Sequence, residues 1–513
     1  MKPSTELFKL ISTLTKSEKR FFKLNSSLQS GDKNYLKIFD FIESRNHYDE
    51  DALKAEFKNE TFIKHLSSEK NHLYHLILKS LRSFYSEDSV SSLHKQELKN
   101  IEILYDKALY SECLKFVQRG KALVEVNEKF YYWYELISWE KRLLEELLNA
   151  KEYERKFNEV LEEEKLVVEK LRNLAEYQVL YSRIGLLSKN GGFHRNDIDA
   201  ILVQEIEDHH LIKGKKTALS VRAASICYYI KGLCSAFNRN YVDAFIFFTK
   251  TKEILDNNPK IKADTGQHYL MTLSNLLKCC IDAHDFDNAE KIVVDIRTME
   301  GKKGFNSIDS TIRIFATSYN LELWLFNVKG DFQKAVELVP FIESSWDEYE
   351  EKIAKDQVAL FTFNKAVTFF GFGDFKRALF YTNRILNNSE GVRKDIDSFS
   401  RILNLIIHYE LDNLDFLSYN LKSTSRYFSK NSYQQEIENL SLNYLRKLSK
   451  ADSQIDKLRI FQDMKSELDE VLKNPFEQSI LEYFNIAAWV ESKLQRFSLG
   501  DAIKYKLEEN SKA

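Results

Sequence analysis

The chain has 513 residues but only 15 glycines and 4 prolines. Sheet proteins need many more of these turn residues, so the composition predicts an all-α fold. The formal net charge is -2, with 30% charged residues of both signs, which excludes the strongly basic composition typical of nucleic-acid-binding proteins.

Residues 1–90 form the first predicted domain, an N-terminal helical module. Charged side chains interrupt Met1–Lys23, so we expect neither an export signal nor membrane insertion. Asp49–Phe57 and Phe62–Phe84 have the pattern of a helix, a turn and a helix, and two interpretations stay open. The module could cap the repeats, or it could contact DNA through the second helix. The residues available for such a recognition surface are Lys64, His65, Ser68, Lys70, Asn71 and His72.

A five-residue phrase recurs further along the chain: Asp or Asn, an aromatic residue, two solvated residues and alanine. It begins at Asn240, Asp285, Asp331 and Asp374, and its alanines lie 45, 46 and 43 residues apart. A repeat at this interval predicts a solenoid of stacked helical pairs, and extending the period gives about eight pairs. Weaker equivalents fall near Cys113, Lys156 and Ala200, and at Asp415–Tyr419 with Tyr419 in the alanine position.

Within each pair we call the helices A and B. The polar residue of the phrase should be the N-cap of helix B, where its short side chain accepts a hydrogen bond from the first turn. The alanine should lie where helices A and B cross, because only a small side chain fits there. The predicted N-cap residues are Asn240, Asp285, Asp331, Asp374 and Asp415.

Residues 91–440 are the predicted repeat domain, and residues 441–513 a predicted C-terminal helical cap. Tyr433–Leu448 and Ser453–Leu472 have the periodicity of another helical pair. Asn474 and Pro475 predict the start of one last helix, since proline suits the first helical turn.

Several of these residues form a pattern that resembles the tetratricopeptide repeat (TPR) family. The pattern comprises Tyr228, Gly232, Tyr241, Ala244, Phe248 and Pro259, with inter-helix turns at Gly330–Ala335 and Gly373–Ala378. The resemblance implies a right-handed α-α superhelix of about eight long helix pairs, whose concave face is lined by helix A and binds protein. The period exceeds the 34 residues of that family, so we expect longer helices.

Positions of helix A that match the family's concave face are the candidate peptide-binding groove. The asparagines among them can both donate to and accept from a peptide backbone, and the aromatic residues could anchor side chains or belong to the core. The candidate groove residues are Tyr229, Leu233, Phe237, Asn275, Lys278, Asn320, Trp324, Asn327, Phe363, Asn364 and Phe370.

No phosphate-binding loop, dinucleotide motif or hydrolase motif occurs in the sequence, so we expect no enzyme activity and no cofactor. His72 and His75 lie one turn apart, but two imidazoles do not complete a metal site. The five cysteines show no disulfide framework, which indicates reduced thiols in the cytoplasm.

The predicted function is therefore a non-catalytic scaffold or adaptor that binds a protein or an extended peptide. The alternative is a peptide-sensing regulator whose N-terminal module contacts DNA or a partner protein, because a small helical module before long repeats is similar in layout to such regulators. Nucleic acid would bind only through residues 1–90, and we expect no membrane contact.

Overall fold

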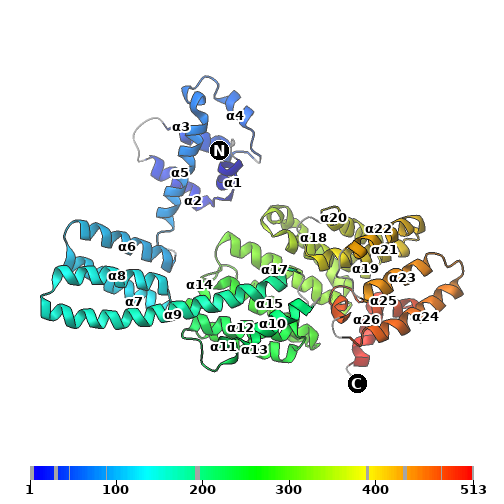
Figure 1. The fold of residues 1–513 in the computed structure, drawn as a ribbon. Coiled ribbons are helices and arrows are strands. Elements are labelled where there is room, and N and C mark those ends of the chain that lie inside the picture. The colour runs from blue at the N-terminus through cyan, green and yellow to red at the C-terminus, as the bar shows by residue number, and fades with distance from the viewer. Residues whose placement is uncertain are drawn as a thin grey trace. The chain divides into compact units, whose positions relative to one another are not determined.

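The computed structural model describes residues 5–27, 33–45, 47–87, 89–190, 197–388, 392–430, 436–474 and 477–510. Every regular element in these residues is a helix (Figure 1). Neighbouring helices pack in pairs, so the prediction of an all-α fold is confirmed. None of the described helices combines the length and the apolar character needed to cross a bilayer.

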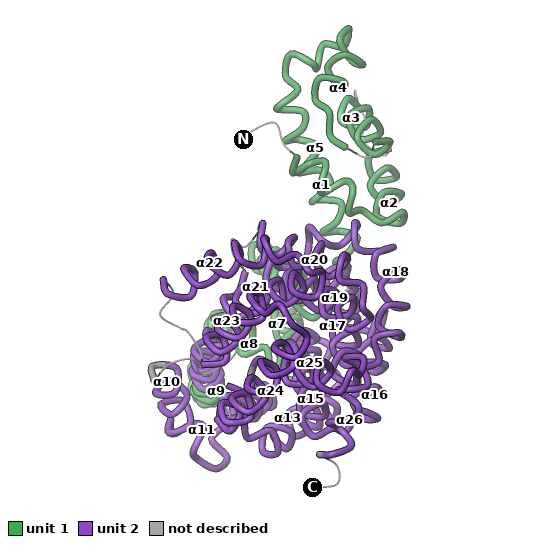
Figure 2. The backbone as a smooth tube through the Cα atoms, turned by 90° about the vertical axis from the view of Figure 1, so that its right-hand side faces the viewer, with its two compact units in different colours: residues 1–169 green, residues 170–513 purple. Residues whose placement is uncertain are grey.

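The chain divides into two compact units, Met1–Glu169 and Lys170–Ala513, which Figure 2 shows in different colours. The boundary falls inside the long helix α9 (Ala150–Asn190). The division predicted at residues 90 and 440 rests on the repeat pattern and stays a prediction.

The first unit begins with short helices that enclose a hydrophobic core of their own, which includes Leu7, Phe39 and Ile77. Longer paired helices follow, and α9 continues into the second unit. The first predicted helix, Asp49–Phe57, corresponds to α4, and the second, Phe62–Phe84, corresponds to η1 followed by α5. The elements are α1 (Thr5–Thr13), α2 (Lys16–Ser27), α3 (Asn34–Glu43), α4 (Glu50–Glu56), η1 (Thr61–His65), α5 (Leu66–Phe84), α6 (Val90–Asp106), α7 (Tyr110–Val126) and α8 (Phe130–Leu147).

The second unit contains the helices that carry the repeated phrase. Its first part consists of α10 (Asp197–Asp208), α11 (His210–Lys213), α12 (Val221–Phe237), α13 (Tyr241–Asp256), α14 (Pro259–Asp264), α15 (Gly266–Asp282), α16 (Phe286–Arg297), α17 (Ile308–Lys329) and α18 (Phe332–Tyr349). Its second part consists of η2 (Glu350–Lys352), α19 (Lys355–Phe372), α20 (Phe375–Asn387), α21 (Lys394–Glu410), α22 (Leu414–Lys430), α23 (Glu436–Leu448), α24 (Gln454–Val471), η3 (Glu477–Glu482), α25 (Ile486–Gln495) and α26 (Leu499–Asn510).

One type of turn joins helix A to helix B in most of the repeats. The residue before each N-cap has a positive φ, and the amide N–H of the cap donates to the carbonyl five residues earlier, as Asp285 does to Cys280 at 2.8 Å. This arrangement is a Schellman motif, which satisfies the last carbonyls of helix A. The positive-φ residues of these turns are Ala108, Arg239, His284, Gly330, Gly373 and Asp412.

The alanines of the phrase are completely buried, as their proposed place at the helix crossing requires. Ala244, Ala289, Ala335 and Ala378 are each 0% exposed. A side chain larger than a methyl group would have no room there, because protein interiors are packed as densely as organic crystals. The phrase therefore marks the contact between the two helices of a pair.

Three predicted caps have the expected hydrogen bond. The side chains of Asn240, Asp285 and Asp374 each accept from the backbone N–H three residues later. Asp331 occupies the N-cap position without a side-chain capping bond, and its carboxylate instead lies 2.8 Å from Nζ of Lys504.

The prediction for the next repeat was wrong by two residues. Asp415 lies in the first turn of α22, and Asn413 takes the turn position, where its N–H donates to the carbonyl of His408. Leu417 is 0% exposed and takes the alanine position, whereas Tyr419 is 72% exposed. The aromatic Phe416 matched the phrase by accident, because a larger buried side chain had replaced alanine.

The C-terminal part of the chain turns back onto the repeats. After α24 it forms η3 and then two helices, α25 and α26, instead of the single helix predicted from Asn474, and Pro475 lies outside the described residues. Helix α26 contacts α17 and α19. Together with α17, α18, α20 and α21, it buries every residue from 361 to 370 in α19, so the middle of this helix is covered on all sides.

Candidate functional site

The candidate groove residues lie on the A helices of four consecutive pairs, α12, α15, α17 and α19. Their side chains occupy three different environments. One group belongs to the hydrophobic core, a second forms hydrogen bonds between neighbouring A helices, and a third contacts a segment from the C-terminal part of the chain.

The core group contains most of the aromatic candidates. Tyr229 and Phe237 are 1% and 7% exposed, and Leu233 is partly buried against the same core. Phe363 and Phe370 on α19 are 0% and 3% exposed. The alternative that helix A aromatics pack in the core therefore describes Tyr229 and Phe237 well.

The asparagines connect neighbouring A helices. Asn275 Nδ2 donates to the hydroxyl of Tyr229 at 2.9 Å, which joins α15 to α12. Asn364 Nδ2 donates to Asn320 Oδ1 at 2.8 Å, and Asn327 Nδ2 donates to the carbonyl of Asn364 at 3.0 Å. These carboxamides thus satisfy one another between α17 and α19, where an unpaired amide would destabilise the fold.

Lys278 and Trp324 belong to the third group, and both contact Glu482. The Lys278 ammonium lies 2.8 Å from the Glu482 carboxylate. The indole N–H of Trp324 donates to the main-chain carbonyl of the same residue at 2.7 Å. Arg239 and Tyr241 complete the contacts, because the guanidinium lies 3.5 Å from the carboxylate and the phenol donates to it at 3.2 Å.

Tyr483 follows directly and lies among residues of α19 and α21. Its ring centroid is 4.7 Å from that of Phe399 and 6.0 Å from that of Phe363. Its hydroxyl donates to the carboxylate of Asp395 and accepts from the guanidinium of Arg393 at 2.7 Å. Asp395 is 0% exposed, so the tyrosine hydroxyl and Arg393 satisfy a fully buried carboxylate.

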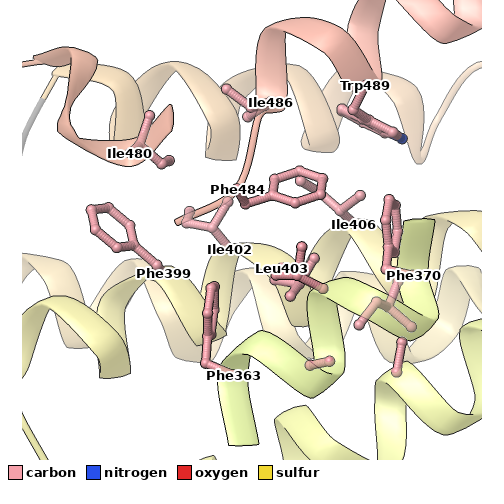
Figure 3. Packing of buried hydrophobic residues seen from close by; sticks show 14 of the residues in the cluster. Phe363, Phe370, Phe399, Ile402, Leu403, Ile406, Ile480, Phe484, Ile486 and Trp489 are labelled. Carbon is pink, nitrogen blue, oxygen red and sulfur yellow. The ribbon is translucent and has the colours of Figure 1, made fainter. Parts of the chain in front are cut away.

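Phe484 completes the contact surface of the segment. Its ring meets the edge of Phe370 at 5.2 Å between centroids, with an interplanar angle of 86°, a geometry favoured by aromatic pairs. Figure 3 shows Phe484 and Ile480 reaching from the C-terminal segment toward Phe363, Phe370 and Phe399. The segment from Leu481 to Phe484 thus lies on the A helices that carry the predicted peptide-binding residues.

The electrostatics of the Glu482 contacts involve several shifted pKa values. Burial opposes the charged form of Lys278, but the carboxylate of Glu482 outweighs this effect and raises the pKa of the ammonium. Desolvation and the neighbouring Glu482 raise the pKa of Asp282 to about 6. Burial also raises the pKa of Tyr241 to about 12, so its phenol is a hydrogen-bond donor at neutral pH.

The sequence did not predict that Arg239 and Tyr241 contact Glu482. It also did not predict that the segment Leu481–Phe484 lies on the A helices. Arg239 is the positive-φ residue of its turn, and Tyr241 was identified only as the aromatic of the phrase. Glu482 lies 158 residues from Trp324 and 241 from Tyr241. The one signal in the sequence was a carboxylate followed by two aromatic residues, within the stretch where one last helix was predicted.

The suggested DNA-recognition surface on the N-terminal module needs one correction. Lys70 is only 4% exposed, and its ammonium lies 2.7 Å from Glu50 and 3.0 Å from the Tyr48 hydroxyl. It therefore stabilises the module from within and does not face a ligand. The other members of that set, Lys64, His65, Ser68, Asn71 and His72, are exposed.

The described residues contain no group of three or more side chains placed to bind a metal ion. All five cysteines are buried and unbridged. Burial raises the pKa of Cys234 and Cys279 to about 12 and that of Cys280 to about 11. These thiols are protonated at neutral pH and are therefore poor nucleophiles.

Comparisons with protein-family models, with curated proteins and with solved structures found no match to the chain. The contacts of Lys278, Trp324 and their neighbours with Leu481–Phe484 are therefore the strongest indication of function in the second unit.

Proposed function

We propose that the chain is a non-catalytic binding protein whose helical pairs stack into a TPR-like right-handed superhelix. The A-helix face, which is the surface formed by α12, α15, α17 and α19, would bind a protein or an extended peptide. One observation carries this proposal: the face already holds a short stretch of chain, through a hydrogen bond from Trp324 to a main-chain carbonyl and through side-chain contacts.

The chemistry of this face supports recognition of a peptide. A tryptophan that donates to a backbone carbonyl can bind any extended chain, while charged and aromatic neighbours select among side chains. The helices that present these groups are held together by the Asn320, Asn327 and Asn364 bonds. Such a rigid face loses little conformational entropy when a ligand binds.

The protonated cysteines and the absence of a metal-binding cluster in the described residues are compatible with a role in binding. The five unbridged thiols support a reducing compartment such as the cytoplasm. We therefore place the protein there as a scaffold or adaptor.

A random peptide library displayed on phage tests the proposal with the full chain as bait. We expect enriched peptides to bind the wild type and to bind the Trp324→Ala variant at least about 10-fold more weakly, as for an interface tryptophan worth more than about 1.4 kcal/mol. Binding would be measured with purified peptides by calorimetry.

The matched control is Phe380→Ala, which removes an aromatic side chain that is 61% exposed on α20. This variant should bind the enriched peptides as the wild type does. Equal affinity of the wild type and of Trp324→Ala for every enriched peptide would show that the binding face lies elsewhere. Failure of both the wild type and the Glu482→Ala variant to enrich any peptide would contradict the proposed function itself.

A further inference from the structure

The segment that lies on the A-helix face is fixed at both of its ends. The carboxylate of Glu477 accepts from the backbone N–H groups of Glu436 and Ile437, both at 3.1 Å, at the start of α23. Asn485 caps α25 by accepting from the N–H of Ala488 at 2.9 Å. The residues between these anchors could therefore leave the face while α23 and α25 keep their N-terminal hydrogen bonds.

The contacts at Glu482 are more specific than would be needed only to hold the segment in place. Its carboxylate meets Lys278, Arg239 and Tyr241, and its side chain is 16% exposed. Buried ion pairs contribute little more stability than well-packed apolar side chains, because both charges lose their hydration. Such a site strongly discriminates against residues without a carboxylate, since the cations would then be left without their partner.

The next two positions are equally selective. A tyrosine hydroxyl at position 483 satisfies both Arg393 and the buried Asp395, and only an aromatic ring reaches between Phe363 and Phe399. At position 484 the ring packs edge-on against Phe370. The face thus recognises a carboxylate, a tyrosine and a second aromatic ring in consecutive positions.

The segment leaves part of this site accessible. Leu481, Glu482 and Tyr483 are only partly buried, in contrast to Phe484 at 3% exposure. A cavity of about 40 Å³ remains beside them, with Trp324 and Val367 among its lining residues. This space is large enough for at least one water molecule beside the segment.

We propose that the ligand of this face is a peptide segment with an acidic residue followed directly by two aromatic residues, and that Glu482-Tyr483-Phe484 is an internal competitor for it. The proposal rests on the proposed function and adds the chemistry of the ligand and its regulation. A partner binds when it carries the same three side chains and displaces residues 481–484 from Lys278 and Trp324.

An internal competitor makes free ligands bind weakly. A tethered segment acts at an effective concentration of about 1 mM or more, and the apparent affinity of an external ligand falls by the fraction of molecules with an empty face. A change in the segment itself that weakens the internal contact and leaves the face intact should therefore strengthen binding of an external peptide, although it removes a contact from the protein.

The test uses the full chain and a fluorescent peptide with the sequence of residues 477–485. Anisotropy titrations compare the wild type with Glu482→Ala and with Glu482→Ala/Lys278→Ala. We expect Glu482→Ala to bind the peptide at least about 10-fold more tightly than the wild type, which corresponds to about 1.4 kcal/mol. The double variant should not show this increase in affinity, because its emptied site lacks the lysine that binds the glutamate of the peptide.

A control peptide with alanine in place of the glutamate equivalent to Glu482 should bind the Glu482→Ala chain at least about 10-fold more weakly than the original peptide. If Glu482→Ala does not fold, as judged by circular dichroism, Glu482→Gln keeps the side-chain volume and serves in its place. Hydrogen exchange at residues 480–485 should increase in either variant.

Unchanged peptide affinity in the folded variant would overturn the proposal, as would equal binding of the two peptides. The phage library separates this failure from failure of the proposed function. Enriched peptides that need Trp324 but lack the acidic and aromatic order would contradict the ligand class alone.

Discussion

His268 is a residue whose protonation is coupled to the stability of the second unit. Its ring lies 4.7 Å from that of Tyr229 and 6.2 Å from that of Tyr181. Burial among these rings lowers its pKa to about 4. The unfolded chain binds a proton near the ordinary histidine pKa of about 6.5, whereas the folded chain does not until about pH 4.

Because the folded pKa is lowered, the stability due to this group is fully present above about pH 6.5 and is lost as the pH falls toward 4. We expect the wild type to lose about 3 kcal/mol from this histidine over that range, because its pKa falls from about 6.5 in the unfolded chain to about 4 in the folded chain. His268→Gln should remove that part of the pH dependence. Urea unfolding at several pH values, followed by circular dichroism, measures it.

His210→Gln is the matched control, because this histidine is exposed. It should leave the pH dependence of the urea midpoint unchanged. An identical pH dependence in the wild type and in His268→Gln would show that the buried imidazole is not responsible for it.

At the scale of elements, the Schellman turns use glycine in only some repeats. Gly373 has φ +90° and open space around the position of a Cβ atom. Gly330 has φ +72°, and a Cβ atom there would lie 2.7 Å from the carbonyl oxygen of Gly500 in α26. Substitutions of the two glycines therefore distinguish the cost of backbone strain alone from the cost of strain together with a steric clash.

Gly373→Ala should cost about 1 kcal/mol, since alanine in the left-handed region is strained. Gly330→Ala should cost about 2 kcal/mol or more, because it adds a clash between α17 and α26. Urea unfolding compares the two variants. Hydrogen exchange should increase in α26 only for Gly330→Ala, and equal effects of both substitutions would contradict the close contact.

The sequence predicted the repeat elements wherever the phrase was complete. Helix B begins one residue after the predicted cap at Tyr241, Phe286, Phe332 and Phe375. Extrapolation by the period alone succeeded for the buried Cys113 but failed for Ala200, which is exposed in α10. A period predicts where a helix should begin, but helix lengths differ between pairs, so the error grows with each extrapolated step.

The candidate site was predicted only in part, for a different physical reason. Lys278 and Trp324 were proposed because they match the helix A positions that line the concave face in the TPR family. Their contact with Glu482, the last residue of η3, joins positions that lie 158 residues apart in the case of Trp324, and no local pattern encodes such a pairing. The internal bonds of Asn320 and Asn364 were also not predictable, since an asparagine pairs equally well with a ligand.

At the scale of the whole molecule, the two compact units have separate hydrophobic cores. Leu136 on α8 and Leu403 on α21 are both 0% exposed, in residues 1–169 and 170–513 respectively. In repeat proteins each helical pair contacts mainly its neighbours, so long arrays need not unfold in one step.

We expect urea to unfold the two units in separate transitions. Leu136→Ala and Leu403→Ala should each cost about 2–5 kcal/mol, as buried leucines do, and each should lower the midpoint of its own unit alone. Hydrogen exchange with mass spectrometry assigns the transitions to residues. A single transition shifted equally by both substitutions would show that the chain unfolds as one cooperative unit.

The order of synthesis gives the Glu482 contact a further consequence. Tyr483 follows Asp395, its buried partner on α21, by 88 residues, and ribosomes extend a chain by about 5–20 residues per second, so the two are made roughly 4–18 seconds apart. The A-helix face can therefore form on the ribosome before its internal competitor has been translated. If the face binds the proposed ligand, the nascent protein meets that ligand without competition, and the affinity of a partner depends on whether it arrives during translation or after it.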